Sequence, residues 1–179
     1  MEAYEHVVKV WLETKGFVVS SGVKFPVKVL TRKKSRQEYQ VHGYEMDLVA
    51  ARRDKLVLVN VKSYFGSHGL SLKRLQEEKL FSDPVIFKGV IREACKRYGY
   101  SVEDIELWVA SGRVTPKKRI AIEAYLEMFS KRQKIRTAFI GVEAIADGLV
   151  AAIEHKMYIN DPEIAVLRAL DAAGKIQKE

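Results

Sequence analysis

Two carboxylates, an amide and a lysine are spaced at two-residue intervals on either side of a tight turn predicted at residues 53–54. Glu45 and Asp47 precede this turn, and Asn60 and Lys62 follow it. Alternate residues of a strand share a face, so a two-residue turn places Asp47 opposite Asn60 and Glu45 opposite Lys62. Carboxylate and amide oxygens suit Mg²⁺, and a neighbouring lysine can stabilise charge on a phosphate. The pattern indicates either phosphodiester hydrolysis or an ordinary Glu–Lys ion pair with Asp47 capping a turn.

The elements that must position these side chains follow the order α-β-β-β-α-α-β-α-β-α-α. An amphipathic helix over 4–12 is followed by apolar segments at 17–19 and 27–30, which Gly22 and Pro26 separate into an interrupted strand or a wide hairpin. The strands 43–50 and 55–62 come next. The later elements are helices over 70–80, 84–98, 116–132, 142–153 and 162–173, and strands over 105–110 and 135–141. This order predicts an α/β domain whose mixed sheet is covered by helices on both faces.

Composition sets the class of protein before any motif is considered. The chain has 179 residues, 47% of them hydrophobic, which predicts one folded domain over 1–179. Its single cysteine, Cys95, and the lack of a basic and apolar leader predict a cytoplasmic protein that does not enter a membrane. The formal charge is +8, and most of the excess lies in the first 136 residues. Such an excess favours a polyanionic partner, although an interspersed solvated surface gives the same total.

The segment from Gly43 to Ser63, GYEMDLVAARRDKLVLVNVKS, resembles the core motif of the PD-(D/E)xK nucleases, which have the restriction-endonuclease-like fold. The resemblance implies an α-β-β-β-α-β core over about 1–110, with a C-terminal extension over about 111–179. It implies a DNA endonuclease that uses Mg²⁺, with Mn²⁺ able to substitute. By resemblance Asp47 is a metal ligand, Lys62 is the catalytic lysine, and Val61 contributes its carbonyl oxygen to the metal.

The N-terminal segment carries a second resemblance. Glu5, the apolar stripe that follows it and the sequence GFVV at 16–19 are similar to the first helix and strand of archaeal Holliday-junction resolvases. In those proteins a glutamate of the first helix completes the metal site, which makes Glu5 the candidate here. Glu2 is a competing choice, and a solvent-facing helix carboxylate is the alternative interpretation of Glu5.

One position departs from the nuclease motif, because Asn60 stands where the superfamily usually has an acidic residue. Amides occur at this place among divergent members, and an amide lowers the negative charge that holds the cation. Glu45 is predicted to compensate by offering a carboxylate from the same face as Asp47. The alternative is a catalytically impaired module that keeps the fold and binds nucleic acid without cleaving it.

A basic segment between Gly22 and Gln37 contains no acidic residue. As a loop between strands it could follow a phosphate backbone, or it could simply be a solvated basic loop. The predicted DNA-binding residues of this segment are Lys24, Lys28, Arg32, Lys33, Lys34 and Arg36. A third hypothesis is an interaction protein in which the last helices, over 142–173, form a homodimer contact.

Overall fold

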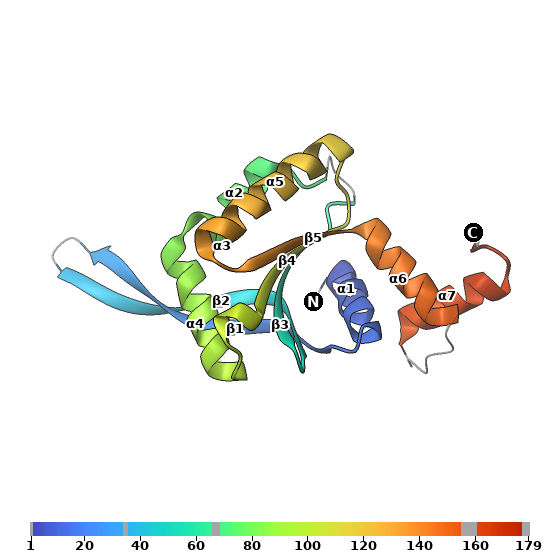
Figure 1. Cartoon of the computed structure of the whole chain (residues 1–179), viewed down its shortest axis with the longest axis horizontal. Coiled ribbons are helices and arrows are strands. Elements are labelled where there is room, and N and C mark those ends of the chain that lie inside the picture. Colours follow the sequence, from blue (N-terminus) through green and yellow to red (C-terminus); the bar gives the residue numbers. More distant parts are fainter. Residues whose placement is uncertain (1, 34–35, 66–68, 155–160, 177–179) are drawn as a thin grey trace.

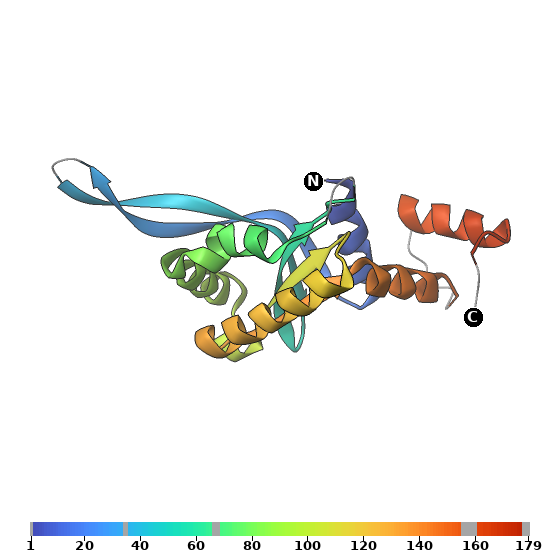
Figure 2. The same ribbon diagram turned by 90° about the horizontal axis from the view of Figure 1, so that it is seen from above.

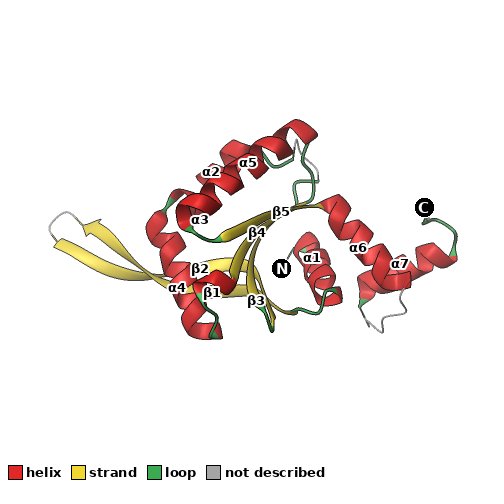
Figure 3. Ribbon diagram, viewed as in Figure 1, coloured by secondary structure: helices red, strands yellow, loops and turns green. Residues whose placement is uncertain are grey.

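The structure, a computed structural model, describes residues 2–33, 36–65, 69–154 and 161–176, with only the backbone described at 31–33, 36–38 and 154. Its centre is a five-stranded sheet with helices on both faces (Figures 1 and 3). The strands follow the spatial order β1 (Val18–Lys33), β2 (Arg36–Arg52), β3 (Lys55–Lys62), β4 (Ile105–Ser111) and β5 (Arg136–Gly141). The helices are α1 (Ala3–Thr14), α2 (Leu72–Glu77), α3 (Lys79–Ser82), α4 (Pro84–Tyr98), α5 (Pro116–Gln133), α6 (Val142–Glu154) and α7 (Pro162–Ala172), with a short 3₁₀ turn at Val102–Asp104.

The sheet is mixed. Strands β1, β2 and β3 form an antiparallel meander, whereas β3, β4 and β5 run parallel to one another. Parallel neighbours need a crossover connection, and helices α2–α4 and α5 supply the two crossovers. The predicted α/β class, with a mixed sheet flanked by helices, is therefore confirmed.

Strand β3 divides its side chains between two apolar cores. Leu56 and Leu58 face the core beneath α4 and α5, and Val57 and Val59 face the core beneath α1 and α6. This alternation is typical of a central strand that is covered on both faces. Asn60 continues the row of Leu56 and Leu58, so a polar side chain follows apolar ones on one buried face. A polar position at the end of a covered strand is where a functional site is expected.

Local signals fix the ends of the helix that packs against the first two strands. The side chain of Asp83 accepts hydrogen bonds from the amides of Val85 and Ile86, at 2.8 and 3.4 Å, and Pro84 occupies the first turn of α4. Gly99 ends α4 in the left-handed conformation with φ 77°.

The predicted helix over 70–80 is instead two short helices, α2 and α3, separated at Glu78.

Strands β1 and β2 continue together past the sheet as a two-stranded ribbon, which extends away from the body of the molecule (Figures 1 and 2). The predicted interruption between 19 and 27 is wrong, because β1 is continuous. As an edge strand, β1 tolerates Pro26, which has no amide hydrogen to pair. The basic segment after Gly22 was expected as a loop and instead forms this ribbon.

The C-terminal helix α7 is joined to α1 by a small charged cluster. His6 Nε2 lies 3.3 Å from Asp161 Oδ2 and 3.1 Å from Glu163 Oε2. Asp161 also caps α7 by accepting a hydrogen bond from the Glu163 amide at 3.1 Å.

Within the described ranges, no helix combines the length and the apolar composition needed to cross a membrane.

Candidate functional site

The antiparallel pairing of β2 with β3 stops just before the predicted chemical residues. The register runs from Arg52 opposite Lys55 to Leu48 opposite Val59, as the predicted turn requires. Two residues beyond Val59, the Val61 amide donates a hydrogen bond to the side-chain oxygen Oδ2 of Asp47, at 2.6 Å. A side-chain oxygen thus takes the place of a backbone carbonyl, and it lets β2 leave β3 and follow β1 into the ribbon. Because the strands separate here, the end of β3 and the middle of β2 can contact other elements.

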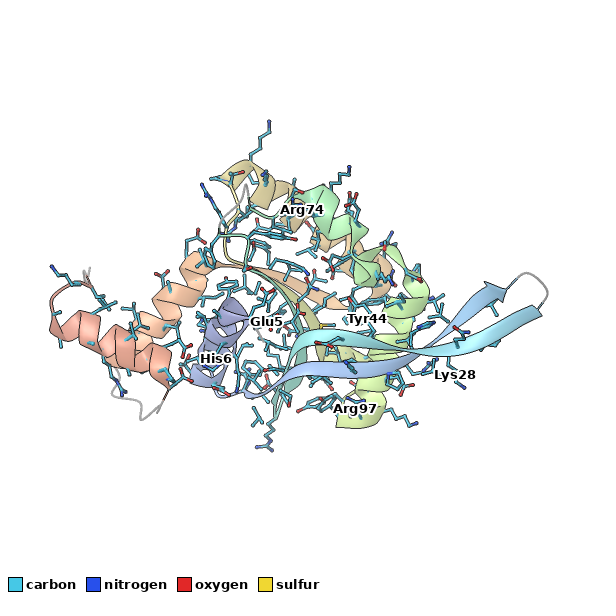
Figure 4. All side chains as sticks on the ribbon, turned by 180° about the vertical axis from the view of Figure 1, so that it is seen from behind. Glu5, His6, Lys28, Tyr44, Arg74 and Arg97 are labelled. Atoms are coloured by element: carbon cyan, nitrogen blue, oxygen red, sulfur yellow. The ribbon has the colours of Figure 1, made fainter. Side chains whose placement is uncertain are left out.

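Asp47 is surrounded by charges that come from three further elements. Burial is the largest cause that raises the pKa of its carboxyl above the ordinary value, and the hydrogen bond from the Val61 amide opposes this rise. The Lys62 ammonium also lowers the pKa. The carboxylates of Glu5, on α1, and Glu78, between α2 and α3, raise it. The predicted residues Glu5, Asp47 and Lys62 are therefore brought together, and Figure 4 shows Glu5 in the central part of the molecule.

Lys62 is held by a carboxylate that the sequence did not reveal. Its Nζ lies 2.9 Å from Glu78 Oε1, with the two side chains 18% and 29% exposed. Glu78 has extended backbone angles, φ −62° and ψ 131°, between the two short helices. A continuous helix would have carried this side chain in another direction. The break between α2 and α3 is therefore what places a carboxylate beside Lys62.

The predicted contact between Glu45 and Lys62 is wrong. Glu45 is 55% exposed and its Oε2 lies 3.6 Å from Lys24 Nζ on β1. The physical reason is that β2 has already left β3 at Asp47, so Glu45 pairs across the ribbon and not across the sheet. The structure does not bring Glu45 to Lys62, and the compensating role proposed for it loses its basis.

Asn60 is buried next to these charges with its amide oxygen unsatisfied. The residue is 5% exposed, and its Oδ1 has no hydrogen-bond partner among the described residues. Leaving a buried acceptor unsatisfied costs about 1–3 kcal/mol, so such a group commonly has a ligand or a function. An amide oxygen is also an acceptable ligand for a hard cation.

Tyr44 is a further residue of this cluster that sequence reasoning missed. Its side chain is half-buried on β2, and burial is the main cause that raises its pKa above the ordinary value. The negative charges of Glu78 and then Asp47 add to the rise, whereas a hydrogen bond with the Leu80 backbone lowers it. Tyr44 stays neutral and can donate a hydrogen bond at the site. A lone tyrosine in an alternating strand gave no signal of this role.

Glu5 has a structural contact as well as its position near Asp47. Its Oε2 accepts a hydrogen bond from the Glu2 amide, at 3.1 Å, as part of a capping box at the start of α1. Glu2, the competing choice, is exposed, and its Oε2 lies 3.5 Å from Ser63 Oγ. Of the two, Glu5 is the one whose charge acts on Asp47.

The oxygens of this cluster are of the type that a hard divalent cation prefers, although among the described residues Asp47, Glu5 and Glu78 do not form a group whose ligand atoms all lie within 4.8 Å of one another. Asp47, Glu5 and Glu78 offer carboxylate oxygens, and Asn60 offers the unpartnered amide oxygen. All-oxygen sets of this kind suit Mg²⁺ or Mn²⁺. Asp47 is influenced by two further carboxylates and by one lysine, which leaves an excess of negative charge that a cation would neutralise. Coordination by the Val61 carbonyl stays a prediction, whereas the Val61 amide is the group that holds Asp47.

The predicted DNA-binding residues all belong to the β1–β2 segment but share no single environment. Lys24 pairs with Glu45, and Lys28 lines a groove against α4. Arg32, Lys33 and Arg36 lie on the ribbon backbone, while their side chains and the whole of Lys34 lie outside the described residues.

Among the described residues, the group of metal-type ligands whose atoms lie close together is found instead at the contact of α1 with α7. Ligand atoms of His6, Asp161 and Glu163 all lie within 4.8 Å of one another. The pKa of Glu163 is raised, chiefly by its hydrogen bond with Asp161. The imidazole lies between the two carboxylates, so the cluster is a polar contact between the helices. Figure 4 shows His6 apart from Tyr44, and the group is centred on the contact between α1 and α7.

Comparisons with known proteins assign no activity to this site. No protein-family model matches the chain, and no curated protein sequence matches it either. A solved structure entitled "Crystal Structure of Protein of Unknown Function AF1548" is similar, with a TM-score of 0.47 and 16% sequence identity over 96% of this chain and 77% of that one. Its title carries no activity.

Proposed function

We propose that the chain is a divalent-metal-dependent nuclease that hydrolyses phosphodiester bonds in DNA, with its active site at Asp47, Asn60 and Lys62. The observation that carries the proposal is the buried, unpartnered Asn60 oxygen in the same short stretch of β3 as Val61, which binds Asp47, and Lys62. The resemblance to PD-(D/E)xK nucleases supports the same roles, and we propose a restriction-endonuclease-like core on that basis.

Each residue of the site has a distinct part in this proposal. Asp47, Glu5 and Asn60 hold the cation, which when bound supplies Lewis-acid stabilisation of charge on the scissile phosphate. Lys62 places its ammonium at the end of β3, where it stabilises negative charge that develops on a phosphate oxygen. Glu78 orients Lys62 and supplies negative charge that Asn60 lacks. Tyr44, neutral at working pH, donates a hydrogen bond to the substrate.

The direct test is nicking of supercoiled plasmid by the purified chain. We expect nicked and linear products with Mg²⁺ or Mn²⁺ and none with EDTA, because the carboxylates alone cannot stabilise the charge of the reaction. Incubation of the same plasmid with the Asp47→Asn variant controls for contaminating nucleases. Cleavage that persists in EDTA, or equal cleavage by the variant, would contradict the proposal.

A non-catalytic nucleic-acid-binding module is the second candidate function. The neutral side chain at Asn60 favours it, because the cation is held by fewer charges than in the full motif. Binding of DNA by the purified chain, with no cleavage at any Mg²⁺ or Mn²⁺ concentration, would establish this second function in place of the first.

The substitution Asn60→Asp tests whether the neutral side chain at this position limits metal binding. The change is nearly isosteric and adds one negative charge at a buried position beside Asp47, so the Mg²⁺ concentration for half-maximal cleavage should fall about 10-fold. A readout without catalysis is thermal unfolding, in which added Mg²⁺ should raise the Tm of the variant more than that of the wild type. An unchanged Mg²⁺ dependence in both measurements would place Asn60 outside the metal site.

A further inference from the structure

A groove of about 650 Å³ separates part of the β1–β2 ribbon from α4. It is lined by Lys28, Tyr39 and Val41 of the ribbon and by Val85, Lys88 and Arg92 of α4. The lining therefore has three cationic side chains and no acidic one. The two walls come from segments that are about sixty residues apart in sequence, so only the fold brings these cations together.

Two contacts hold α4 against the base of the ribbon. Gly89 lies so close to β1 that a Cβ atom added there would be 2.5 Å from Val27 Cγ1. At the next-to-last residue of α4, the Arg97 guanidinium donates to the Lys24 carbonyl at 2.9 Å and lies 5.0 Å from the centre of the Phe25 ring. Figure 4 shows Lys28 further along the ribbon than Arg97. These contacts fix the position of α4 relative to β1, and so the width of the groove, at the base of the ribbon.

The cations of the groove are mostly available to a ligand. Across the described part of the chain, Lys28 and Lys88 take part in no ion pair, and Arg92 has only a 3.4 Å contact with its neighbour Glu93. Lys88 and Arg92 are four residues apart, so they project from the same side of α4. Two of the three cations thus have no counter-ion among the described residues and the third has a single one, so an anion in the groove would lower the repulsion between them.

Exposed apolar side chains accompany these charges. Tyr39 is 74% exposed, Val41 60% and Val85 54%. An exposed aromatic ring beside cations fits a nucleic acid, in which sugars and bases offer apolar contacts and stacking between the phosphates. Large exposed apolar groups of this kind are otherwise costly to solvate.

We propose that this groove binds the sugar-phosphate backbone of a DNA duplex next to the bond that the active site cuts. The inference rests on the proposed function. Tyr44 of the site and the groove residues Val41 and Tyr39 lie on the same strand, so at about 3.3 Å per residue the groove begins roughly 10 Å and ends roughly 17 Å from Tyr44. Successive phosphates of one strand of B-DNA advance about 3.4 Å along the helix axis, so a duplex whose axis runs along the ribbon would place in the groove phosphates three to five nucleotides from the site. A polymer reaches both places, whereas a free phosphate or a mononucleotide does not.

The test compares two triple variants that lose the same positive charge. The groove variant is Lys28→Gln, Lys88→Gln, Arg92→Gln; the control variant is Lys117→Gln, Lys131→Gln, Arg132→Gln, which changes exposed positions of α5. Binding to a labelled 24-base-pair duplex is measured by fluorescence anisotropy in EDTA at several salt concentrations, so cleavage plays no part. We expect the groove variant alone to lose about 100-fold in affinity at 0.1 M salt, with a slope of log K against log salt that is smaller by about 2–3.

Several outcomes would overturn the proposal. Equal losses in the two variants would show a general charge effect, and no loss in the groove variant would place the DNA elsewhere. Competition by millimolar inorganic phosphate would show an anion site that recognises no polymer. Binding of the wild type to anionic phospholipid vesicles but not to the duplex would identify a membrane surface instead. If the groove variant still nicks plasmid and binds duplex like the wild type, only the groove assignment fails and the nuclease proposal stands.

Discussion

Replacement of Asp47 by asparagine should strongly reduce metal-dependent cleavage and leave the protein at least as stable as the wild type. A carboxylate that holds the cation contributes several kcal/mol to charge stabilisation in the reaction, and each 1.36 kcal/mol is tenfold in rate. We therefore expect a loss of about 100- to 1,000-fold in nicking rate at saturating Mg²⁺. The asparagine side-chain oxygen can still accept the hydrogen bond from the Val61 amide, so the local backbone keeps its partner.

The stability of this variant has a defined dependence on pH. The folded-state pKa of Asp47 is raised above its ordinary value of 3.8, mainly by burial. The folded state thus holds a proton that the unfolded state has lost, and wild-type stability falls as pH rises through this interval. Asparagine does not titrate. The Tm of the variant should exceed that of the wild type at neutral pH, and the difference should shrink toward zero as pH approaches 4.

Glu45→Gln is the matched control for Asp47→Asn. It removes a carboxylate two residues away on the same strand, where the side chain is 55% exposed and turned toward Lys24. Cleavage and Mg²⁺ dependence should stay as in the wild type. If Glu45→Gln instead destroys cleavage, the compensating role that the structure argues against would be restored. Loss of folding by Asp47→Asn, seen as a lower Tm at neutral pH, would make Asp47 a packing residue.

The register of the β2–β3 hairpin could be predicted because the alternating pattern and the turn at 53–54 left one consistent pairing. Leu48 opposite Val59 follows from the same count that placed Asp47 beside Asn60. The count failed at Glu45, because a regular hairpin was extended past the point where Asp47 replaces a backbone partner. The periodicity of a sequence does not show where a strand loses one of its two neighbours, as β2 loses β3 at the hydrogen bond of Asp47.

The residues that the sequence did not reveal depend on tertiary context. Glu78 lies in a segment of helical periodicity, and only the packed structure shows that the helix breaks there and turns the carboxylate to Lys62. Arg92 and Lys88 read as ordinary surface charges of an amphipathic helix. Their functional interest arises from the contact of α4 with the ribbon through Gly89, a long-range contact that no local pattern predicts.

Replacement of Lys62 by methionine should reduce turnover by about 100- to 1,000-fold, while affinity for duplex DNA in EDTA changes little. Lys62 is placed to stabilise charge that develops during the reaction, and removal of one preorganised donor of this type costs that much in kcat. Its ion pair with Glu78 is partly exposed, so the loss in stability should stay below about 1 kcal/mol. Methionine keeps most of the apolar stem.

The control for Lys62→Met is Lys55→Met at the opposite end of the same strand. Lys55 also pairs with a carboxylate, Glu106, at 3.1 Å. Removing it leaves the buried Glu106 with Arg136 and the Trp108 indole as its partners, so this variant should lose stability but keep its turnover. Single-turnover cleavage at saturating enzyme separates the chemical step from binding. A parallel loss of affinity and turnover in Lys62→Met would make Lys62 a phosphate contact. Unchanged turnover would instead leave Lys62 and Glu78 as a structural ion pair, because a lysine that acts in the chemical step cannot be removed without slowing it.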